Sequence, residues 1–239
     1  MCIVMGADTA TIPSLRQAPT VGRKPLPALC NSNIMLGLFK QKEKKSPELV
    51  FWSWFIDYKK KIEHFVDSDH KDYSVYNKLT NKIQEYNKNV FPELTKSSND
   101  EFVLIITPDG MKDGVEPTKS LAAAAPEIEN WIITKFRQPT DKILLNFKGL
   151  EYPSSDIEIL HEIDSEREVV NINVFVRNMN KDPATYQSLA FLYLDHILGE
   201  FNSIMKVGYI DFHHLDQDKK VENGISLIDL RNLIANELY

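Results

Sequence analysis

From Phe51 onward, the apolar residues repeat with the period of an α-helix. On a helical wheel referenced to Phe51, one side holds a set of apolar residues, and the opposite side holds Ser53, Asp57, Lys60 and His64. The sequence therefore predicts a helix in which most of the aromatic stretch FWSWF faces a core. The apolar side consists of Trp54, Phe55, Tyr58, Ile62, Phe65 and Val66.

Trp52 and Ile56 depart from this pattern, because they fall roughly 100° and 140° away from Phe51 on the wheel. They have two interpretations: contact with a second layer of the same fold, or contact with an outside partner. We favour the internal interpretation.

The period changes along the chain after a second predicted helix at residues 73–88. Residues 91–110 show the alternation of two strands joined by the turn SSND, and Asp109-Gly110 marks a turn after the second strand. Residues 116–127 predict a short helix that starts near Pro117 and is closed by Pro126, and residues 130–139 predict a strand.

The same order of elements returns in the second half. Residues 155–178 predict a two-stranded hairpin, 182–205 a long helix, 207–215 a strand and 226–238 a last helix. The pattern predicts an α+β fold with two ββαβ units, in which antiparallel hairpins carry helices on one sheet face, preceded by two helices. We expect residues 47–139 to form the first unit and residues 140–239 the second, packed together as one globular body.

Residues 1–46 differ in composition from the rest of the chain. Residues 1–34 contain four prolines and scattered small and polar residues without a sustained period, and Met35 begins a stretch that resembles a protein start. Such a composition is typical of a segment that does not recover its ordering entropy. We expect residues 1–46 to be a flexible extension and linker without a folding role.

Composition narrows the classes of function. The 239 residues are 43% hydrophobic and carry a net charge of -6, which argues against nucleic acid as a general partner. Residues 151–239 hold 16 acids and 7 bases, so this half carries -9, which suits either a solvated surface or a basic partner. The apolar runs are too short for a membrane span, and the two cysteines support no disulfide framework. We expect a cytoplasmic protein.

Common catalytic and cofactor motifs do not occur in the sequence. It has no GxGxxG, GxxxxGK[ST], GxSxG, HExxH, paired CxxC or EF-hand loop, and only 9 glycines. His161 stands alone on an aliphatic strand face, and His213 and His214 are strand neighbours that point to opposite faces. We therefore assign no metal, no cofactor and no catalytic residue.

Alternation in the second hairpin separates an aliphatic face from a polar face. Asn173 and Arg177 belong to the polar face, and if Ile210 and Phe212 are buried, then Asp211 and His213 join them. A histidine beside a carboxylate, near an arginine and an amide, suits binding of a small anion or transfer of a proton. The alternative is an ordinary solvated sheet face. The candidate ligand-binding residues are Asp211, His213, Asn173 and Arg177.

Glu200 falls at the edge of the apolar face of the predicted helix 182–205. A carboxylate drawn toward a core needs a partner or a raised pKa, and a structural tie is the favoured reading over catalysis. The adjacent Gly199 permits close approach of another backbone, and Arg137 is a candidate partner for Glu200 across the interior. We predict that Glu200 and Arg137 form a structural polar pair.

The succession FWSWF, FVLIITPDG, AAAAPEIENWIITKFRQP and LDHILGEF is similar to a set of uncharacterised bacterial cytosolic proteins, a domain of unknown function with a tryptophan-rich first helix. The resemblance covers roughly residues 35–239 and implies a fold but no activity. Its marker positions in this sequence are Trp52, Trp54, Asp109, Gly110, Ala125, Pro126, Trp131, Arg137 and Glu200.

These observations lead to two hypotheses of function. The first is a non-enzymatic, cytosolic protein-binding or regulatory module that meets its partner through the acidic second half or the edge formed by Trp52 and Ile56. The second is a small-molecule-binding protein or enzyme that uses the polar sheet face. A concave pocket that unites Asp211, His213, Asn173 and Arg177 would favour the second hypothesis.

Overall fold

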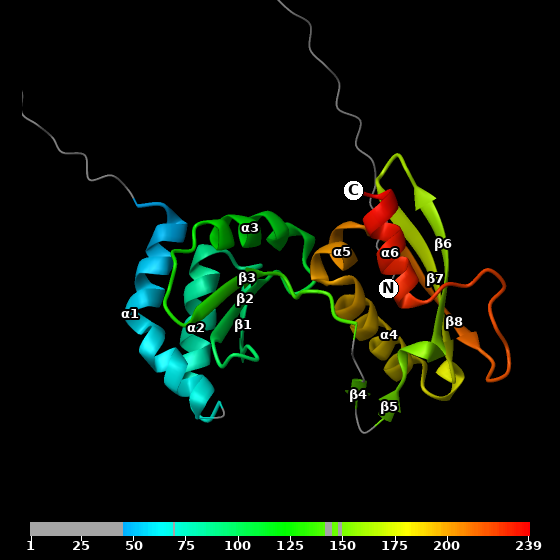
Figure 1. Cartoon of the computed structure of the whole chain (residues 1–239), viewed down its shortest axis with the longest axis horizontal. Helices are drawn as coiled ribbons and strands as arrows, with labels where there is room; N and C mark the ends of the chain where they lie inside the picture. The colour runs from blue at the N-terminus through cyan, green and yellow to red at the C-terminus, as the bar shows by residue number, and fades with distance from the viewer. Residues whose placement is uncertain (1–44, 69, 142–144, 148–149) are drawn as a thin grey trace, which may run out of the picture. The chain divides into compact units, whose positions relative to one another are not determined.

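The computed structural model describes residues 45–68, 70–141, 145–147 and 150–239 (Figure 1). The expectations for residues 1–34, and for all but the last residues of the predicted extension 1–46, lie outside this part of the chain. The described residues belong to one compact unit.

Two helices precede the first sheet. Helix α1 runs from Pro47 to Asp67 and helix α2 from Tyr73 to Tyr86. Each starts at a residue whose side chain accepts a backbone N–H bond from the first turn: Ser46 from Leu49, and Asp72 from Ser74. Pro47 occupies the first turn of α1, where a missing N–H costs nothing.

The first sheet follows these helices and has the ββαβ order. Strand β1 (Phe91–Lys96) pairs antiparallel with β2 (Phe102–Thr107), helix α3 (Val115–Ala123) crosses over, and β3 (Trp131–Lys135) returns parallel to β2. The strand order is β1-β2-β3, so β2 lies in the centre.

The aromatic stretch of α1 lies in the core of this first unit. Phe51, Trp52 and Phe55 are buried against side chains of α2, β2 and α3, and the Phe55 ring meets the Trp131 ring edge-on at 5.0 Å. The indole N–H of Trp52 donates to the Leu121 carbonyl at 2.9 Å, which fits the internal interpretation of this residue. Ile56 instead is 45% exposed.

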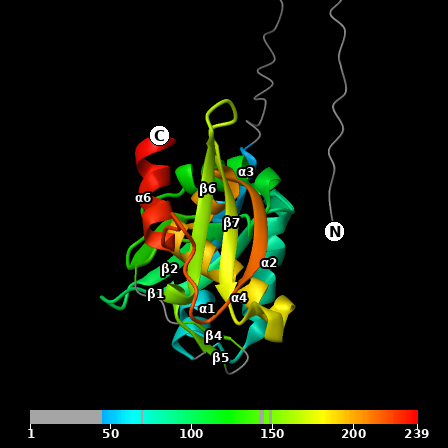
Figure 2. The same cartoon turned by 90° about the vertical axis from the view of Figure 1, so that its right-hand side faces the viewer.

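The second unit repeats the order with longer strands. Strand β6 (Ile157–Asp164) pairs antiparallel with β7 (Val169–Arg177), and β8 (Val207–Leu215) pairs parallel with β7. Helices α4 (Pro183–Leu198) and α5 (Glu200–Met205) form the crossover, and α6 (Leu227–Glu237) follows β8. The strand order is β6-β7-β8, as seen in Figure 2. A small hairpin that the sequence pattern does not predict, β4 (Leu145–Phe147) and β5 (Leu150–Tyr152), precedes β6.

The helices of the second unit cover one face of its sheet. Val170, Ile172, Val174 and Val176 of β7 are fully buried against α4 and α6. The α+β prediction, with two ββαβ units preceded by two helices, is therefore confirmed. The α4 side chains in this core are Tyr186, Leu189, Ala190, Tyr193, Leu194, Ile197 and Leu198, and those of α6 are Leu227, Leu230 and Ile234.

The predicted single helix over 182–205 is wrong, because the chain breaks into α4 and α5 at Gly199. Gly199 has φ 79° and ψ 149°, a combination that residues with a Cβ rarely adopt. A Cβ at this position would lie 2.9 Å from Pro139 Cδ and 3.1 Å from Pro139 N. The break thus lets the segment after β3 pass close to the helix end.

Replacement of Gly199 by alanine is expected to lower the free energy of unfolding by about 2–3 kcal/mol, since it adds a steric clash to an unfavourable backbone conformation. Gly110→Ala is the matched control, because Gly110 has φ 78° but a Cβ there would meet no described atom within 4 Å. The control should cost about 1 kcal/mol. Equal losses in urea denaturation would show that crowding by Pro139 does not matter.

Candidate functional site

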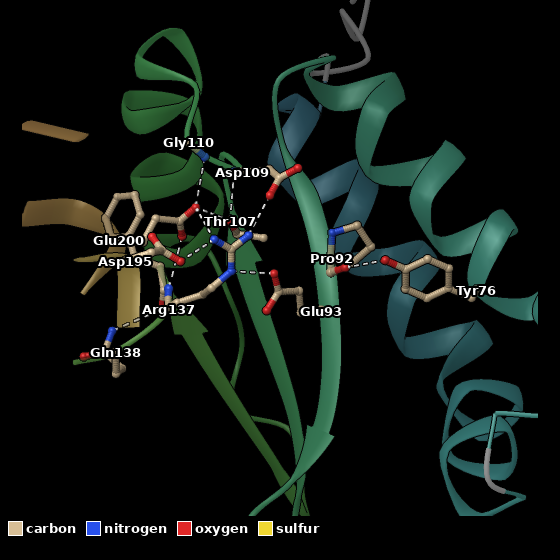
Figure 3. A network of polar contacts seen from close by, with 11 residues as sticks. Tyr76, Pro92, Glu93, Thr107, Asp109, Gly110, Arg137, Gln138, Asp195 and Glu200 are labelled. Atoms are coloured by element: carbon tan, nitrogen blue, oxygen red, sulfur yellow. Dashed lines mark hydrogen bonds and ion pairs between the residues drawn. The ribbon is translucent and has the colours of Figure 1, made fainter. Parts of the chain in front are cut away.

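The ends of three elements meet at a polar cluster that joins the two ββαβ units (Figure 3). Thr107 closes β2, Arg137 follows β3 by two residues, and Glu200 opens α5. We call this group of side chains, together with Glu93, Asp109 and Asp195, the Arg137 cluster. It lies where sequence-distant segments come together, so its members are positioned by the fold and not by a local motif.

Glu200 is the fully buried acidic residue of the cluster. Its carboxyl group accepts bonds from the Thr107 hydroxyl, from the Gly110 N–H at 3.3 Å and from the Arg137 N–H at 3.1 Å. The Glu200 N–H donates in return to the Arg137 carbonyl at 3.0 Å. Arg137 Nη1 is 3.6 Å from Glu200 Oε1, so the two residues proposed as a polar pair are neighbours in the structure.

The guanidinium of Arg137 contacts carboxylates on three other elements. Nε donates to Glu93 of β1 at 2.7 Å, Nη1 to Asp195 of α4 at 2.8 Å, and Nη2 to Asp109 in the turn after β2 at 2.6 Å. Although burial disfavours its charge, the hydrogen bond that Arg137 donates to Glu93 and the negative charges of Glu200 and Asp195 raise the pKa of Arg137. All three nitrogen atoms of the guanidinium donate a bond to a carboxylate of the protein itself, which indicates a structural role.

The path of the backbone at Arg137 corrects the sequence interpretation. The alternation pattern placed Arg137 on a strand face with Trp131, whereas β3 ends at Lys135 and Phe136 adopts a positive φ of 61°. This turn aims the Arg137 side chain toward Asp195. The alternation of side chains along a strand no longer predicts their direction after the strand has ended in such a turn.

The Arg137 cluster carries an excess of acid. A carboxylate offers about four acceptor sites, so one guanidinium bond leaves Glu93, Asp109 and Asp195 with remaining capacity. Burial raises the pKa of Glu200, although the bonds from Thr107 and Arg137 oppose that shift. With one guanidinium against the carboxylates of Glu93, Asp109 and Asp195 and the buried carboxyl group of Glu200, the cluster favours a cationic group over an anion.

Glu200 gives the protein a pH dependence with a definite sign. Because its pKa is raised, the folded chain binds a proton at Glu200 at pH values where the unfolded chain has released it, and this contribution to stability is lost as pH rises through the folded pKa. The free energy of unfolding of the wild type relative to that of Glu200→Gln should therefore be most favourable at pH values below the ordinary pKa of a glutamate, and it should decline as the pH rises above that value. A difference that grows with pH in urea titrations would contradict the raised pKa.

A groove of about 650 Å³ lies beside the Arg137 cluster. Its walls come from α4, α5 and the start of β8, and its polar end is formed by Asp109, Asp195, Lys112 and Arg137. The Phe191 side chain on α4 is 50% exposed, and its ring meets the Phe212 ring at 4.8 Å. The apolar lining consists of Phe191, Leu192, Leu194, Ile204, Val207 and Ile210.

The polar sheet face predicted from the sequence holds three of its four candidate residues together. His213 Nε2 is 2.9 Å from Asn173 Oδ1 and 3.6 Å from Asp211 Oδ2, and the His213 ring stacks on Phe175 with centroids 4.8 Å apart. Asp211 lies opposite Asn173 in the ladder of β7 and β8. These three residues therefore form one small polar and aromatic patch.

Arg177, the fourth candidate, is buried and serves the loop after β8. Its Nη1 donates to the carbonyls of Asp216, Gln217 and Lys219 at 2.7 to 2.9 Å, and its Nη2 donates to Glu158 at 2.7 Å. These bonds indicate that the guanidinium of Arg177 holds the backbone of this loop in place. The groove beside the Arg137 cluster is lined by none of the four candidates Asn173, Arg177, Asp211 and His213.

Sequence reasoning missed the roles of Glu93, Thr107 and Asp195 in the Arg137 cluster. Glu93 and Asp195 are 44 and 58 residues away from Arg137, and each stands in an amphipathic element where a carboxylate is unremarkable. The one available signal was Glu200 at the edge of an apolar helix face. It predicts a buried acid with Arg137 as a partner, but it does not predict Glu93, Thr107 or Asp195 as further members.

No protein-family model matches the chain, and a search of curated proteins finds no match. Within the part of the chain that the structure describes, no helix is long and apolar enough to cross a membrane, and no group of three or more histidine, cysteine or acidic side chains is placed to hold a metal ion.

Proposed function

We propose that the protein is a cytosolic binding module, without catalysis of its own, that holds a segment of a partner protein in the groove between α4, α5 and β8. The observation that supports this proposal best is the groove of about 650 Å³ with an apolar wall and an acidic end. Aromatic side chains in partly desolvated grooves are the usual anchors of protein interfaces.

The chemistry of the groove suits a peptide segment. Phe191 presents half of its surface beside the apolar residues Ile204 and Val207, while Asp109 and Asp195 stand at one end. An apolar side chain of the partner would bury against Phe191, and a basic side chain next to it would meet the carboxylates. The acidic balance of residues 151–239 would attract such a segment from a distance.

The experiment places a photo-crosslinking amino acid at position 191 of the full chain in its native cytoplasm. Tyr73 of α2 is the matched control position, because its aromatic side chain is also exposed and lies outside the groove. We expect a discrete crosslinked protein at position 191 and none at position 73.

The crosslinked protein is then purified and its affinity for the chain is measured by calorimetry. Phe191→Ala should raise the dissociation constant about tenfold or more, the effect of an aromatic anchor, and Tyr73→Ala should leave it within about twofold. Equal effects of both substitutions, or equal crosslinking at both positions, would reject the groove as the binding site.

A second candidate function rests on the patch formed by Asn173, Asp211 and His213. The contact of 2.9 Å between His213 Nε2 and Asn173 Oδ1 and the stacking of the His213 ring on Phe175 create a polar and aromatic surface that would suit a small anionic metabolite. A thermal-shift screen with carboxylate and phosphate metabolites tests it. A stabilising compound whose effect is lost in His213→Ala but retained in Phe191→Ala would favour this function over the first.

A further inference from the structure

The outer edges of the two sheets differ in how they are protected from pairing with another chain. Edge strands commonly carry proline, lysine or a covering segment. Strand β1 contains Pro92 and Lys96, and the outer side of β6 is bridged by two backbone bonds of 2.9 Å between Ile159 and Ile225. Strand β3 has only five residues and ends in Lys135. Three of the four edges are therefore protected or short.

Strand β8 lacks these devices. It has nine residues, contains neither proline nor lysine, and in the described part of the chain its ladder partner is β7 alone. Figure 2 shows β8, in orange, as the outermost strand beside β7. One side of the β8 backbone is thus available to another extended segment.

The open edge of β8 borders the groove. Val207, Gly208 and Ile210 belong to both, and the pairing register with β7 shifts there, because Val170 faces Val207 whereas Ile172 faces Ile210. The side chain of Asn171 accepts the Tyr209 N–H at 2.9 Å and so satisfies the irregular backbone. A strand added along β8 would therefore place its side chains into the groove.

Beyond the irregular pairs, side chains of β8 alternate between the groove side and the polar face. Ile210 and Phe212 pack with the core that contains α4, and Asp211 and His213 lie on the other face with Asn173. Asp211 keeps 48% of its side chain exposed. A pairing segment with apolar residues at alternate positions and a basic residue between them would match both faces.

The charges around the groove favour that chemistry over a second copy of this chain. Besides Lys112, the basic side chain of the groove is Arg137, whose guanidinium is already bonded to three carboxylates. A second copy would bring its own Asp211 and its own acidic surface to the edge, and like charges weaken cross-strand pairing. A basic, partly apolar segment avoids this repulsion.

We propose that the partner protein adds an extended segment as a fourth strand along the free edge of β8, with apolar side chains in the groove and a lysine or arginine opposite Asp211. This inference rests on the proposed function and specifies its binding mode. Backbone bonds to β8 supply the affinity, and Asp211 together with the groove selects the sequence.

The test uses the full chain and a fluorescent peptide of about eight residues that alternates lysine and valine. Binding is followed by anisotropy, and the same peptide with N-methyl groups on alternate residues serves as the backbone control because it cannot pair as a strand. We expect saturable binding of the parent peptide, loss of binding on N-methylation, and slower amide exchange in β8 when the peptide is bound. Retained binding of the methylated peptide, or no binding of the parent peptide, would overturn the proposal.

A pair of charge variants separates the contact at Asp211 from general electrostatic attraction. Asp211→Lys should weaken the lysine peptide about tenfold and improve binding of the glutamate counterpart. Asp218→Lys changes the net charge equally at an exposed loop position and should alter either affinity by less than about twofold. Equal effects of the two variants would reject recognition at Asp211.

The outcomes also distinguish this inference from the proposed function. A partner that crosslinks at position 191 while the peptide fails to bind would remove strand addition and leave the groove as the binding site. A dimer in sedimentation, with β8 amides protected in the absence of peptide, would assign the edge to a second copy and overturn the inference.

Discussion

Replacement of Arg137 by methionine is expected to lower the free energy of unfolding by about 3 kcal/mol or more, measured by urea denaturation at neutral pH. The guanidinium bonds to Glu93, Asp109 and Asp195 and is 3.6 Å from the buried Glu200. Its removal leaves several carboxylates close together, with Glu200 out of contact with water. Breaking such a pair from one side costs more than the pair contributes, since the remaining charge is uncompensated.

Arg167→Met provides the matched control, because Arg167 is exposed and its ion pair with Asp164 spans 3.6 Å. We expect that variant to lose less than about 0.5 kcal/mol. The double variant Arg137→Met/Glu200→Gln should be less destabilised than the sum of the single variants, since the glutamine carries no charge to leave uncompensated. Additive losses would show that Arg137 acts through packing alone.

The Arg137 cluster also links stability to the proposed binding site. One guanidinium holds the turn after β2, strand β1 and helix α4 at the places where they present their carboxylates. The acidic end of the groove is therefore built by the same residue that neutralises part of it. Because Arg137 bonds both Asp109 and Asp195, the repulsion between these two carboxylates is compensated, and both can line the same groove.

Most helices and strands could be predicted from the sequence, because the apolar residues of each element repeat with the period of that element. The period near 3.6 in α1 and the alternation in β6 and β7 are decided by which side chains meet the core. The break at Gly199 was not decided in that way, because the apolar stripe continues across it. It accompanies the close approach of Pro139, which is distant in sequence and whose Cδ lies 2.9 Å from the position that a Cβ of residue 199 would take.

The sequence predicts the candidate site on the polar sheet face only in part, because one of its side chains makes contacts with residues that are distant in sequence. Alternation correctly placed Asp211 and His213 beside Asn173, since ladder neighbours follow from strand parity. Arg177 shares that parity, but its long side chain reaches past the end of the strand to three loop carbonyls. The alternation of residues along a strand determines the sheet face from which a side chain leaves the backbone. The length of the side chain and the hydrogen-bond partners within its reach determine where its polar end lies.

Trp52→Ala is the second substitution with a large expected effect, a loss of about 3–5 kcal/mol in the free energy of unfolding. Trp52 is among the largest fully buried side chains and meets the rings of Phe51 and Phe55 edge-on at 5.0 and 5.4 Å. Its indole N–H donates to the Leu121 carbonyl, so it also ties α1 to α3. Truncation would leave a large cavity and an unpaired buried carbonyl.

Two variants separate these contributions in thermal and urea unfolding. Trp52→Phe keeps most of the ring contacts and should lose about 1–3 kcal/mol, from the hydrogen bond to Leu121 and the smaller volume. Trp54→Ala is the positional control, since Trp54 is half-buried and stacks on Tyr58 at 4.9 Å outside the fully buried set. If Trp54→Ala cost as much as Trp52→Ala, the contact between α1 and α3 would not be what anchors the first helix. Trp52 lies off the main apolar stripe of the helical wheel but is buried, and its hydrogen bond to the Leu121 carbonyl indicates that this position is where α3 packs against α1.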